Sequence, residues 1–271
     1  MGDKVQGTLV IIGGAEDKTG RCEILRKVVE LAGGEEARLV IMTAATEKPE
    51  AVGEDYRRIF KKLRVKEIEI LNISSRTEAN QNRYVQIIQN STGIFFTGGD
   101  QLRITSLLGG TAVYQALQEA YLRGIVIAGT SAGASAMSET MIVEGDSDEA
   151  PKKNTLKMAP GMGLIAEVVV DQHFAQRGRI GRLLSAVAQN PHTLGIGIDE
   201  DTAIAVAANG LFEVYGSQTV TVVDGRQITH TNASESSPSE ALALTNITLH
   251  VLPAGYRFDL NRRIPLEPSA D

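Results

Sequence analysis

Hydrophobic and polar positions along the chain follow two alternating patterns, one typical of buried strands and one typical of helices. Apolar runs rich in β-branched residues, such as "TLVIIGG", "ARLVIMTA", "VKEIEILNI" and "TGIFFTGG", are separated by helical patterns near residues 20–32, 50–63, 78–90 and 101–122. The order continues with "GIVIAGTSAG", a helix after Ser131, "AEVVVDQHF", a helix near 176–189 and "LGIGIDED". Apolar strands separated by helices predict a mainly parallel central sheet covered on both faces. The expected fold class is α/β, a three-layer sandwich.

The pattern changes after residue 200. The stretch "DTAIAVAANGLFEVYGSQTVTVVDGRQI" alternates apolar with polar residues, and it carries two dipeptides typical of hairpin turns, Asn209-Gly210 and Asp224-Gly225. We therefore expect antiparallel strands added to the sheet edge near the C-terminus, then a polar loop over 231–241 and a final strand in "LTNITLHVL". Because the sequence has no internal repeat and no linker-like stretch, it predicts a single domain over residues 1–271.

Polar residues and glycines follow five of the expected strands at the point where each strand ends. In open α/β sheets the ligand site lies beyond the carboxyl ends of the strands, so these clusters are expected on one rim. They are Glu16, Gly98-Gly99, Ser131, Asp171 to His173, and Asp199 to Asp201.

The segment "GTSAG" at this rim matches the G-x-S-x-G turn that exposes a serine hydroxyl between a strand and a helix. The context fits, because "GIVIA" before it is a good buried strand and "AGASAMSE" after it can begin a helix. Such a bend leaves the first N–H groups of the helix without partners, where they could stabilise an oxyanion. Serine also caps helices, so the alternative role for Ser131 is an N-cap.

A serine nucleophile needs a base, and the chain has four histidines. His192, His230 and His250 lie away from the expected rim, whereas His173 ends the strand pattern "VVVDQHF". His173 is therefore the expected base. The acid that would orient it is sought in "GIDED", and spacing alone leaves Asp199, Glu200 and Asp201 open.

The second oxyanion donor is expected from the flexible backbone of "FFTGGDQ", where Gly98 and Gly99 carry no side chain to block the reacting carbonyl. The alternative is a plain loop turn. The order serine, histidine, acid differs from the serine, acid, histidine order of α/β-hydrolases, so an ordinary lipase or esterase fits badly.

Composition narrows the class of protein further. The chain has 271 residues, 42% of them hydrophobic, and a net charge of −6, which argues against a nucleic-acid binder. No apolar run approaches the roughly 20 residues that span a bilayer, and the N-terminal segment lacks a signal-peptide pattern, so we expect a cytoplasmic protein with no membrane partner. The single cysteine, Cys22, cannot form an internal disulfide or a cysteine-based metal site.

Five motifs together resemble one family. "IIGGAEDK", "FFTGGDQLR", "GTSAGA", "VVVDQHF" with "RGRIGRLLSA", and "GIGIDEDTA" are similar to the cyanophycinase family, serine peptidases related to aspartyl dipeptidase on a fold like that of class I glutamine amidotransferases. The resemblance runs from about Leu9 to the final strand. It implies Ser131 as nucleophile, His173 as base and Glu200 as orienting acid. Backbone N–H groups of Gly99 and Ala132 would form the oxyanion hole.

The resemblance also implies a substrate, cyanophycin, a polyaspartate whose β-carboxyls carry arginine, cut from the end into β-Asp-Arg dipeptides through an acyl-enzyme. Its substrate-binding residues map onto Gln101, Asp171, Gln172, Arg179 and Arg182. Glu16 is a further candidate for the same rim. The family implies a homodimer, and the expected reaction, attack of Ser131 on the β-carbonyl of the linkage, needs no metal or organic cofactor.

Two other functions stay open. One is a peptidase of the same mechanism that acts on short aspartyl peptides. The other is a non-catalytic binding protein, against which the presence of Ser131, His173 and Glu200 argues.

Overall fold

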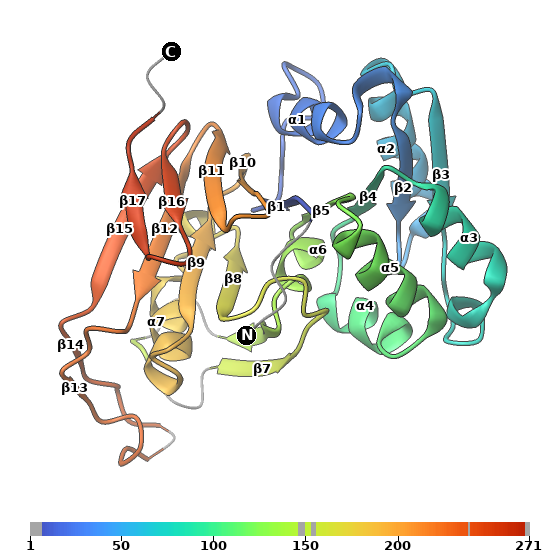
Figure 1. The fold of residues 1–271 in the computed structure, drawn as a ribbon. Helices are drawn as coiled ribbons and strands as arrows, with labels where there is room; N and C mark the ends of the chain where they lie inside the picture. The colour runs from blue at the N-terminus through green and yellow to red at the C-terminus, as the bar shows by residue number, and fades with distance from the viewer. Residues whose placement is uncertain (1–6, 146–149, 153–155, 238, 269–271) are drawn as a thin grey trace.

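The computed structural model describes residues 7–145, 150–152, 156–237 and 239–268. A sheet of nine strands lies at its centre, and Figure 1 labels the strands. Its strand order is β17-β16-β11-β10-β1-β5-β4-β2-β3, with parallel pairing from β1 to β3 and antiparallel pairing from β1 to β17. The parallel strands are β1 (Leu9–Ile12), β5 (Val126–Thr130), β4 (Gly93–Phe96), β2 (Arg38–Met42) and β3 (Glu67–Leu71). The antiparallel strands are β10 (Thr202–Val206), β11 (Leu211–Gly216), β16 (Arg257–Asp259) and β17 (Ile264–Leu266).

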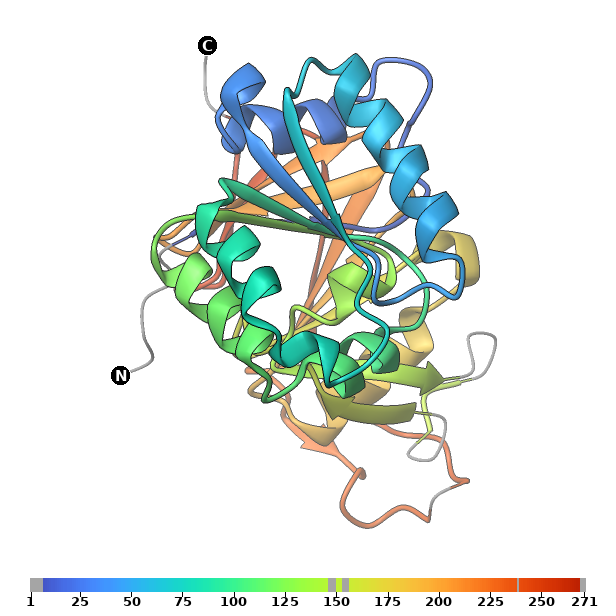
Figure 2. The ribbon, with the colours of Figure 1, turned by 90° about the vertical axis from the view of Figure 1, so that its right-hand side faces the viewer.

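Helices cover both faces of this sheet, as Figure 2 shows along its edge. On one face lie α1 (Glu23–Leu31) and α2 (Pro49–Lys62), and on the other lie α3 (Asn82–Asn90), α4 (Gln101–Leu108) and α5 (Ala112–Leu122). Because side chains alternate along a strand, each parallel strand supplies both cores. In β1, Val10 and Ile12 pack with α1, whereas Leu9 and Ile11 pack in the larger core opposite. The α/β fold class expected from the sequence is confirmed.

A second sheet of four strands stands beside the first, in the order β15-β12-β9-β8. Its strands are β8 (Val168–Gln172), β9 (Leu194–Ile198), β12 (Thr219–Asp224) and β15 (Thr248–Pro253), and α7 (Ile180–Gln189) contacts β9 and β12. After β5 the chain enters the second sheet at β8, and it then passes between the two sheets three more times, from β9 into β10, from β11 into β12 and from β15 into β16. The five polar clusters therefore come from the ends of strands in two sheets rather than one.

Glycines break two of the helical stretches that the sequence pattern treats as continuous. The stretch 101–122 forms α4 and α5, separated at Gly109-Gly110, and the stretch 176–189 forms a 3-10 turn, η3 (Ala175–Arg177), and α7, separated by Gly178. Helix α6 (Ala132–Ser135) is only one turn long. The remaining 3-10 turns are η1 (Gly34–Glu36) and η2 (Glu78–Asn80).

Of the two expected hairpin turns, Asn209-Gly210 joins β10 to β11 as expected. The hairpin expected at Asp224-Gly225 is wrong, because β12 pairs with β9 and with the distant β15 instead. The chain between β12 and β15 forms a small ribbon of β13 (His230–Thr231) and β14 (Leu244–Thr245). Residues 146–149 and 153–155, within the segment 144–160 for which the sequence indicates no definite substrate contact, lie outside the described residues.

A further antiparallel ribbon, which the sequence pattern did not predict, lies next to the turn at residues 129–133. This turn, which contains Ser131, is called the elbow below. The ribbon consists of β6 (Thr140–Gly145) and β7 (Leu156–Pro160). Within the described ranges, no helix is long and apolar enough to cross a membrane.

Candidate active site

Ser131 occupies the sharp bend between β5 and α6, with φ 52° and ψ −110°. A non-glycine residue in such a conformation is strained and must be held by its surroundings. The two glycines of the motif permit the bend: a side chain on Gly129 would meet the carbonyl oxygen of Gly133 at 2.6 Å, and one on Gly133 would meet that of Phe96 at 2.7 Å. The strand and the helix can thus approach closely enough to present a half-buried serine hydroxyl.

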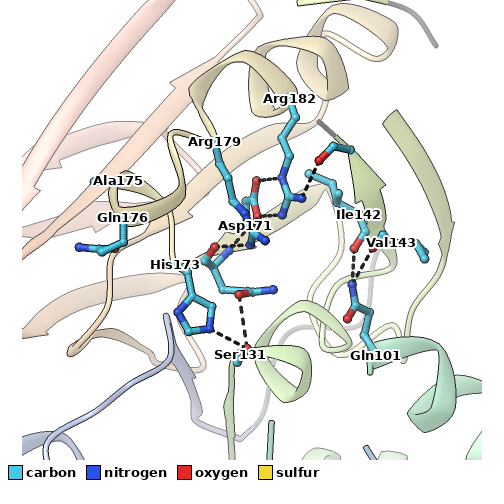
Figure 3. A network of polar contacts seen from close by, with 12 residues as sticks. Gln101, Ser131, Ile142, Val143, Asp171, His173, Ala175, Gln176, Arg179 and Arg182 are labelled. Atoms are coloured by element: carbon cyan, nitrogen blue, oxygen red, sulfur yellow. Dashed lines mark hydrogen bonds and ion pairs between the residues drawn. The ribbon is translucent and has the colours of Figure 1, made fainter. Parts of the chain in front are cut away.

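The Ser131 hydroxyl lies 3.0 Å from Nε2 of His173, and Figure 3 shows the two side chains pointing toward one another. On the other side of the ring, His173 Nδ1 lies 2.6 Å from Oε1 of Glu200. This arrangement fits an imidazole that donates its Nδ1–H to the carboxylate and accepts the serine proton at Nε2. The structure brings together the three residues that the resemblance implied.

The two acids that flank Glu200 have other partners. Asp199 accepts the N–H of Ala175 at 2.9 Å and the hydroxyl of Thr219 at 2.8 Å. Asp201 accepts the N–H of Asp17 and the hydroxyl of Ser217. Both side chains therefore connect the turn between β9 and β10 to neighbouring segments of the chain. Neither carboxylate is hydrogen-bonded to the imidazole of His173.

Burial lowers the pKa of His173 below its ordinary value, while the hydrogen bond to Glu200 opposes that shift. The net direction favours a neutral imidazole at neutral pH, which is the form that can accept a proton.

Two glycine segments surround the reactive atoms. Gly14, with φ +103°, lies directly against the imidazole, because a Cβ on it would be 2.3 Å from Cε1 of His173. Gly98 lies next to the nucleophile, since its Cβ would be 3.4 Å from that of Ser131. Gly99 has φ +145° and no room for a side chain beside the carbonyl oxygen of Ala45. Ala132 is the first residue of α6, where N–H groups have no partner within the helix.

A charge cluster of Asp171, Arg179 and Arg182 lies above Ser131 and His173 in the view of Figure 3. Arg182 donates Nε to Asp171 Oδ2 at 2.6 Å and a second N–H to Oδ1, and Arg179 contacts Oδ1 at 3.3 Å. All three side chains are at least nine-tenths buried, so the arginines are not the solvated surface residues that their helical spacing alone would suggest. Burial lowers the pKa of Arg179 to about 10, against the opposing effect of Asp171.

At neutral pH both guanidinium groups of this cluster are charged and face a single carboxylate. The cluster thus holds an excess positive charge. Arg179 Nε is buried with no partner among the described residues. Such a site is suited to an anionic group.

The remaining expected residues are Gln172, next to Ser131, and Gln101, next to β6. Gln172 presents Oε1 at 3.4 Å from the Ser131 hydroxyl, and its carbonyl accepts from Arg179. Gln101 donates its amide to the carbonyls of Ile142 and Val143 in β6, as Figure 3 shows. Gln101 therefore fixes the position of β6 relative to α4.

Glu16 is placed differently from the rim position considered for it. Its side chain is buried and accepts hydrogen bonds from the hydroxyls of Tyr56 and Thr130.

The sequence analysis missed Gln176, whose side-chain oxygen accepts the N–H of Glu200 at 2.9 Å. Its position three residues after His173 was the available signal. No group of three or more histidine, cysteine, aspartate or glutamate side chains that could hold a metal occurs in the described part of the chain.

Comparison with known proteins identifies the family of this site. The sequence model described as peptidase family S51 matches residues 9–214, about three quarters of the chain, and this range includes the elbow, His173 and Glu200. The chain belongs to peptidase family S51. It is accordingly a serine peptidase, as the resemblance among the five motifs indicated.

Relatives of this S51 peptidase match over nearly the whole chain. A cyanophycinase from a Nostoc species is 42% identical over 259 residues, covering 95% of this chain and 87% of the relative. A cyanophycinase from Geminocystis herdmanii is 39% identical and covers 98% of both chains. Among solved structures, a peptidase from an acI-B1 actinobacterium superimposes with a TM-score of 0.65 at 24% identity, over 82% of this chain and 92% of that one. This last similarity supports the fold.

Proposed function

We propose that this S51 peptidase hydrolyses cyanophycin, releasing β-Asp-Arg dipeptides from the end of the polymer. The observation that carries the proposal is the chain of contacts from Ser131 to His173 to Glu200, found in a sequence whose relatives at 39–42% identity are cyanophycinases. The matches cover 95% and 98% of this chain, so the likeness extends well beyond the motifs.

In the proposed mechanism Ser131 is the nucleophile, His173 the general base and Glu200 the group that orients the imidazole. His173 removes the serine proton as the hydroxyl attacks the substrate carbonyl, and it then protonates the leaving amine. Water, activated by the same imidazole, attacks the acyl-enzyme, and the serine is regenerated. Every step uses groups of the protein, and no cofactor takes part.

The oxyanion that forms in each step is proposed to accept the N–H groups of Gly99 and Ala132. Two observations support this assignment: Gly98, which precedes Gly99, lies beside Ser131, and Ala132 is the first residue of α6. Removing one donor of such a pair costs about 100- to 1,000-fold in turnover in other hydrolases.

The substrate's carboxylates are proposed to bind near Arg179 and Arg182. Asp171 is fully buried and bonded to both, so it acts by holding the guanidinium groups rather than by touching the polymer. Gln172 borders the nucleophile and is suited to contact the bond that is cut. Gln101 is proposed to contribute by holding β6 beside the substrate.

The dipeptide product corrects one expectation about the bond. In β-Asp-Arg the link between the β-carboxyl and arginine is intact, so attack at the β-carbonyl would release free arginine instead. The reacting carbonyl must therefore belong to the aspartate backbone, and the leaving group is the backbone amine of the next aspartate.

The test is incubation of insoluble cyanophycin with the purified protein, followed by mass analysis of the soluble products. We expect β-Asp-Arg from the wild type and from Ser135→Ala, which makes the same chemical change four residues away in α6. We expect none above background from Ser131→Ala. Equal release by Ser131→Ala, or cleavage of short aspartyl peptides with no action on cyanophycin, would refute the proposal.

The proposal includes three further properties: a single domain over residues 1–271, a homodimer and a cytoplasmic location. The extent of the match to the relatives supports the first. Sedimentation equilibrium tests the dimer, for which we expect twice the chain mass of 29.0 kDa; a single-chain mass at micromolar concentration would contradict it.

A further inference from the structure

Three successive backbone carbonyls at the end of β1, those of Ile12, Gly13 and Gly14, accept hydrogen bonds from residues of the site. These three residues are called the β1 segment below. The carbonyl of Ile12 accepts the N–H of Ser131 at 3.0 Å, and that of Gly13 accepts the N–H of His173 at 2.8 Å. The carbonyl of Gly14 accepts the N–H of Asp201, the neighbour of Glu200, at 2.9 Å. One short segment thus contacts the backbone at or next to all three members of the proposed triad.

The three residues that donate to this segment have strained backbones. Ser131, His173 and Asp201 have φ values of 52°, 48° and 48°. Left-handed conformations of non-glycine residues cost roughly 1–3 kcal/mol each and persist only where the surroundings impose them. Hydrogen bonds to the carbonyls of the β1 segment are part of what imposes them here.

The segment is itself irregular and needs support. β1 ends at Ile12, and Gly14 and Ala15 both have positive φ, 103° and 48°. Beyond Gly13, whose N–H donates to the carbonyl of Thr202, no sheet pairing continues. Support must come from the residues that follow.

Glu16 supplies such support from a buried position. The hydroxyl of Tyr56 in α2 donates to its Oε1 at 2.5 Å, and the hydroxyl of Thr130 donates to its Oε2 at 2.6 Å. Lys18 Nζ lies 3.5 Å from Oε1 and above the ring of Tyr56. Burial, and next the Glu16 charge, raise the pKa of Tyr56 well above its ordinary value, so its hydroxyl remains a donor.

Thr130 joins this network to the nucleophile. It is the last residue of β5 and directly precedes Ser131, whose own N–H is bound by Ile12. The side chain of one elbow residue and the backbone of the next are therefore both tied to the segment from Ile12 to Glu16. A movement of Glu16 would therefore shift two groups at once: the Ser131 hydroxyl and the Gly13 carbonyl, which accepts the N–H of His173.

We propose that Glu16 is a positioning residue of the active site, which acts through Thr130 and the β1 segment on the alignment of Ser131 with His173. The inference rests on the proposed catalytic roles of those two residues. Because both carboxylate oxygens accept hydrogen bonds and the residue is 97% buried, Glu16 does not bind substrate. Its loss should lower the rate of the chemical step and leave substrate affinity unchanged.

The most selective test compares Thr130→Val with Thr130→Ser, because valine keeps the shape and removes the donor whereas serine keeps the donor. The first readout is the second-order rate of labelling by a fluorophosphonate, which reports nucleophile activation without any peptide substrate. We expect about tenfold slower labelling for Thr130→Val and recovery to within about threefold of wild type for Thr130→Ser, since small misplacements of reacting groups cost 10- to 100-fold.

Steady-state kinetics on cyanophycin supply the second readout, with kcat falling by the same factor and KM unchanged within twofold. Glu16→Gln and Tyr56→Phe should act in the same direction. Tyr121→Phe is the matched control, because the Tyr121 hydroxyl is buried without a partner in the described part of the structure and lies outside this network. Circular dichroism establishes that each variant is folded.

Equal labelling rates for folded Thr130→Val and wild type would overturn the inference, as would equal defects in Thr130→Val and Thr130→Ser. A rise in KM at constant kcat would also overturn it, by indicating a substrate contact. A wild type that is labelled but releases no dipeptide refutes the proposed substrate and leaves the labelling comparison valid, so the two failures are distinguishable.

Discussion

Three neighbouring acidic residues show how a single residue decides the chemistry of this site. Period-two alternation separates Glu200 from Asp199 and Asp201, but it does not say which side faces His173. In the structure the Glu200 carboxylate lies 2.6 Å from the His173 imidazole. Asp199 and Asp201 instead accept hydrogen bonds from backbone and hydroxyl groups near the turn between β9 and β10. The role proposed for Glu200 follows from the family resemblance and not from spacing.

Replacing the acid should therefore separate catalysis from stability. We expect Glu200→Gln to lower kcat by at least about 100-fold with the fold intact, because the amide no longer stabilises the imidazolium. Asp199→Asn should leave kcat within about threefold but lower the free energy of unfolding by about 1–3 kcal/mol, because it disturbs buried hydrogen bonds. Kinetics and urea unfolding measure the two effects, and the opposite pattern would assign the acid to Asp199.

The pH dependence of kcat/KM should follow the ionisation of His173. The imidazole must be neutral to accept the serine proton, so activity is lost as the pH falls through its pKa. Because burial lowers that pKa, the midpoint should lie below the ordinary value of about 6.5. A midpoint above 7 in the free enzyme would contradict this account of the imidazole.

At the scale of elements, the sequence predicts the strand, bend and helix around Ser131 well, because a glycine-rich turn after an apolar strand is a local signal. It does not predict that α6 is one turn long, or that the segment Gly13 to Ala15 after β1 lies against the imidazole of His173. The second feature depends on contacts between segments more than 100 residues apart, such as the hydrogen bond from the N–H of His173 to the carbonyl of Gly13. A local sequence pattern cannot predict contacts between segments so far apart in the chain.

The contact between Gly14, in the turn that follows β1, and the His173 ring can be tested by adding one methyl group. In Gly14→Ala the new Cβ would overlap the His173 ring, so we expect kcat to fall by about 100-fold. Gly110→Ala is the control, since Gly110 also has positive φ but has open space around it. The control should lose about 1 kcal/mol of stability and no activity. Equal activity of both variants would show that the contact with the ring is unimportant.

For the whole molecule, the main difference from expectation is the second sheet. The pattern of β8 and β9 reads as a continuation of the parallel sheet, because apolar strands look alike whichever partner they pair with. Which strands pair is set by long-range packing, and here β8 and β9 join β12 and β15. The site nevertheless forms at strand ends, because the corner between β9 and β10 places Glu200 beside β1.

The buried charge cluster joins α7 to the second sheet, so its loss should affect the stability of the whole molecule. Asp171→Asn leaves two buried guanidinium groups without a counter-charge, and we expect the free energy of unfolding to fall by about 3–5 kcal/mol. Asp55→Asn, which breaks an exposed pair with Arg58, should change it by less than about 0.5 kcal/mol. Similar losses in urea unfolding would contradict the view of a tightly coupled cluster.

If the imidazole of His173 makes the Ser131 hydroxyl nucleophilic, a reagent selective for activated serines should modify Ser131. The experiment maps the site of covalent modification: the protein is treated with a fluorophosphonate, digested, and its peptides are analysed by tandem mass spectrometry. We expect one modification, on Ser131, and its loss in His173→Ala. Modification of a different residue, or undiminished modification of Ser131 in His173→Ala, would contradict this expectation.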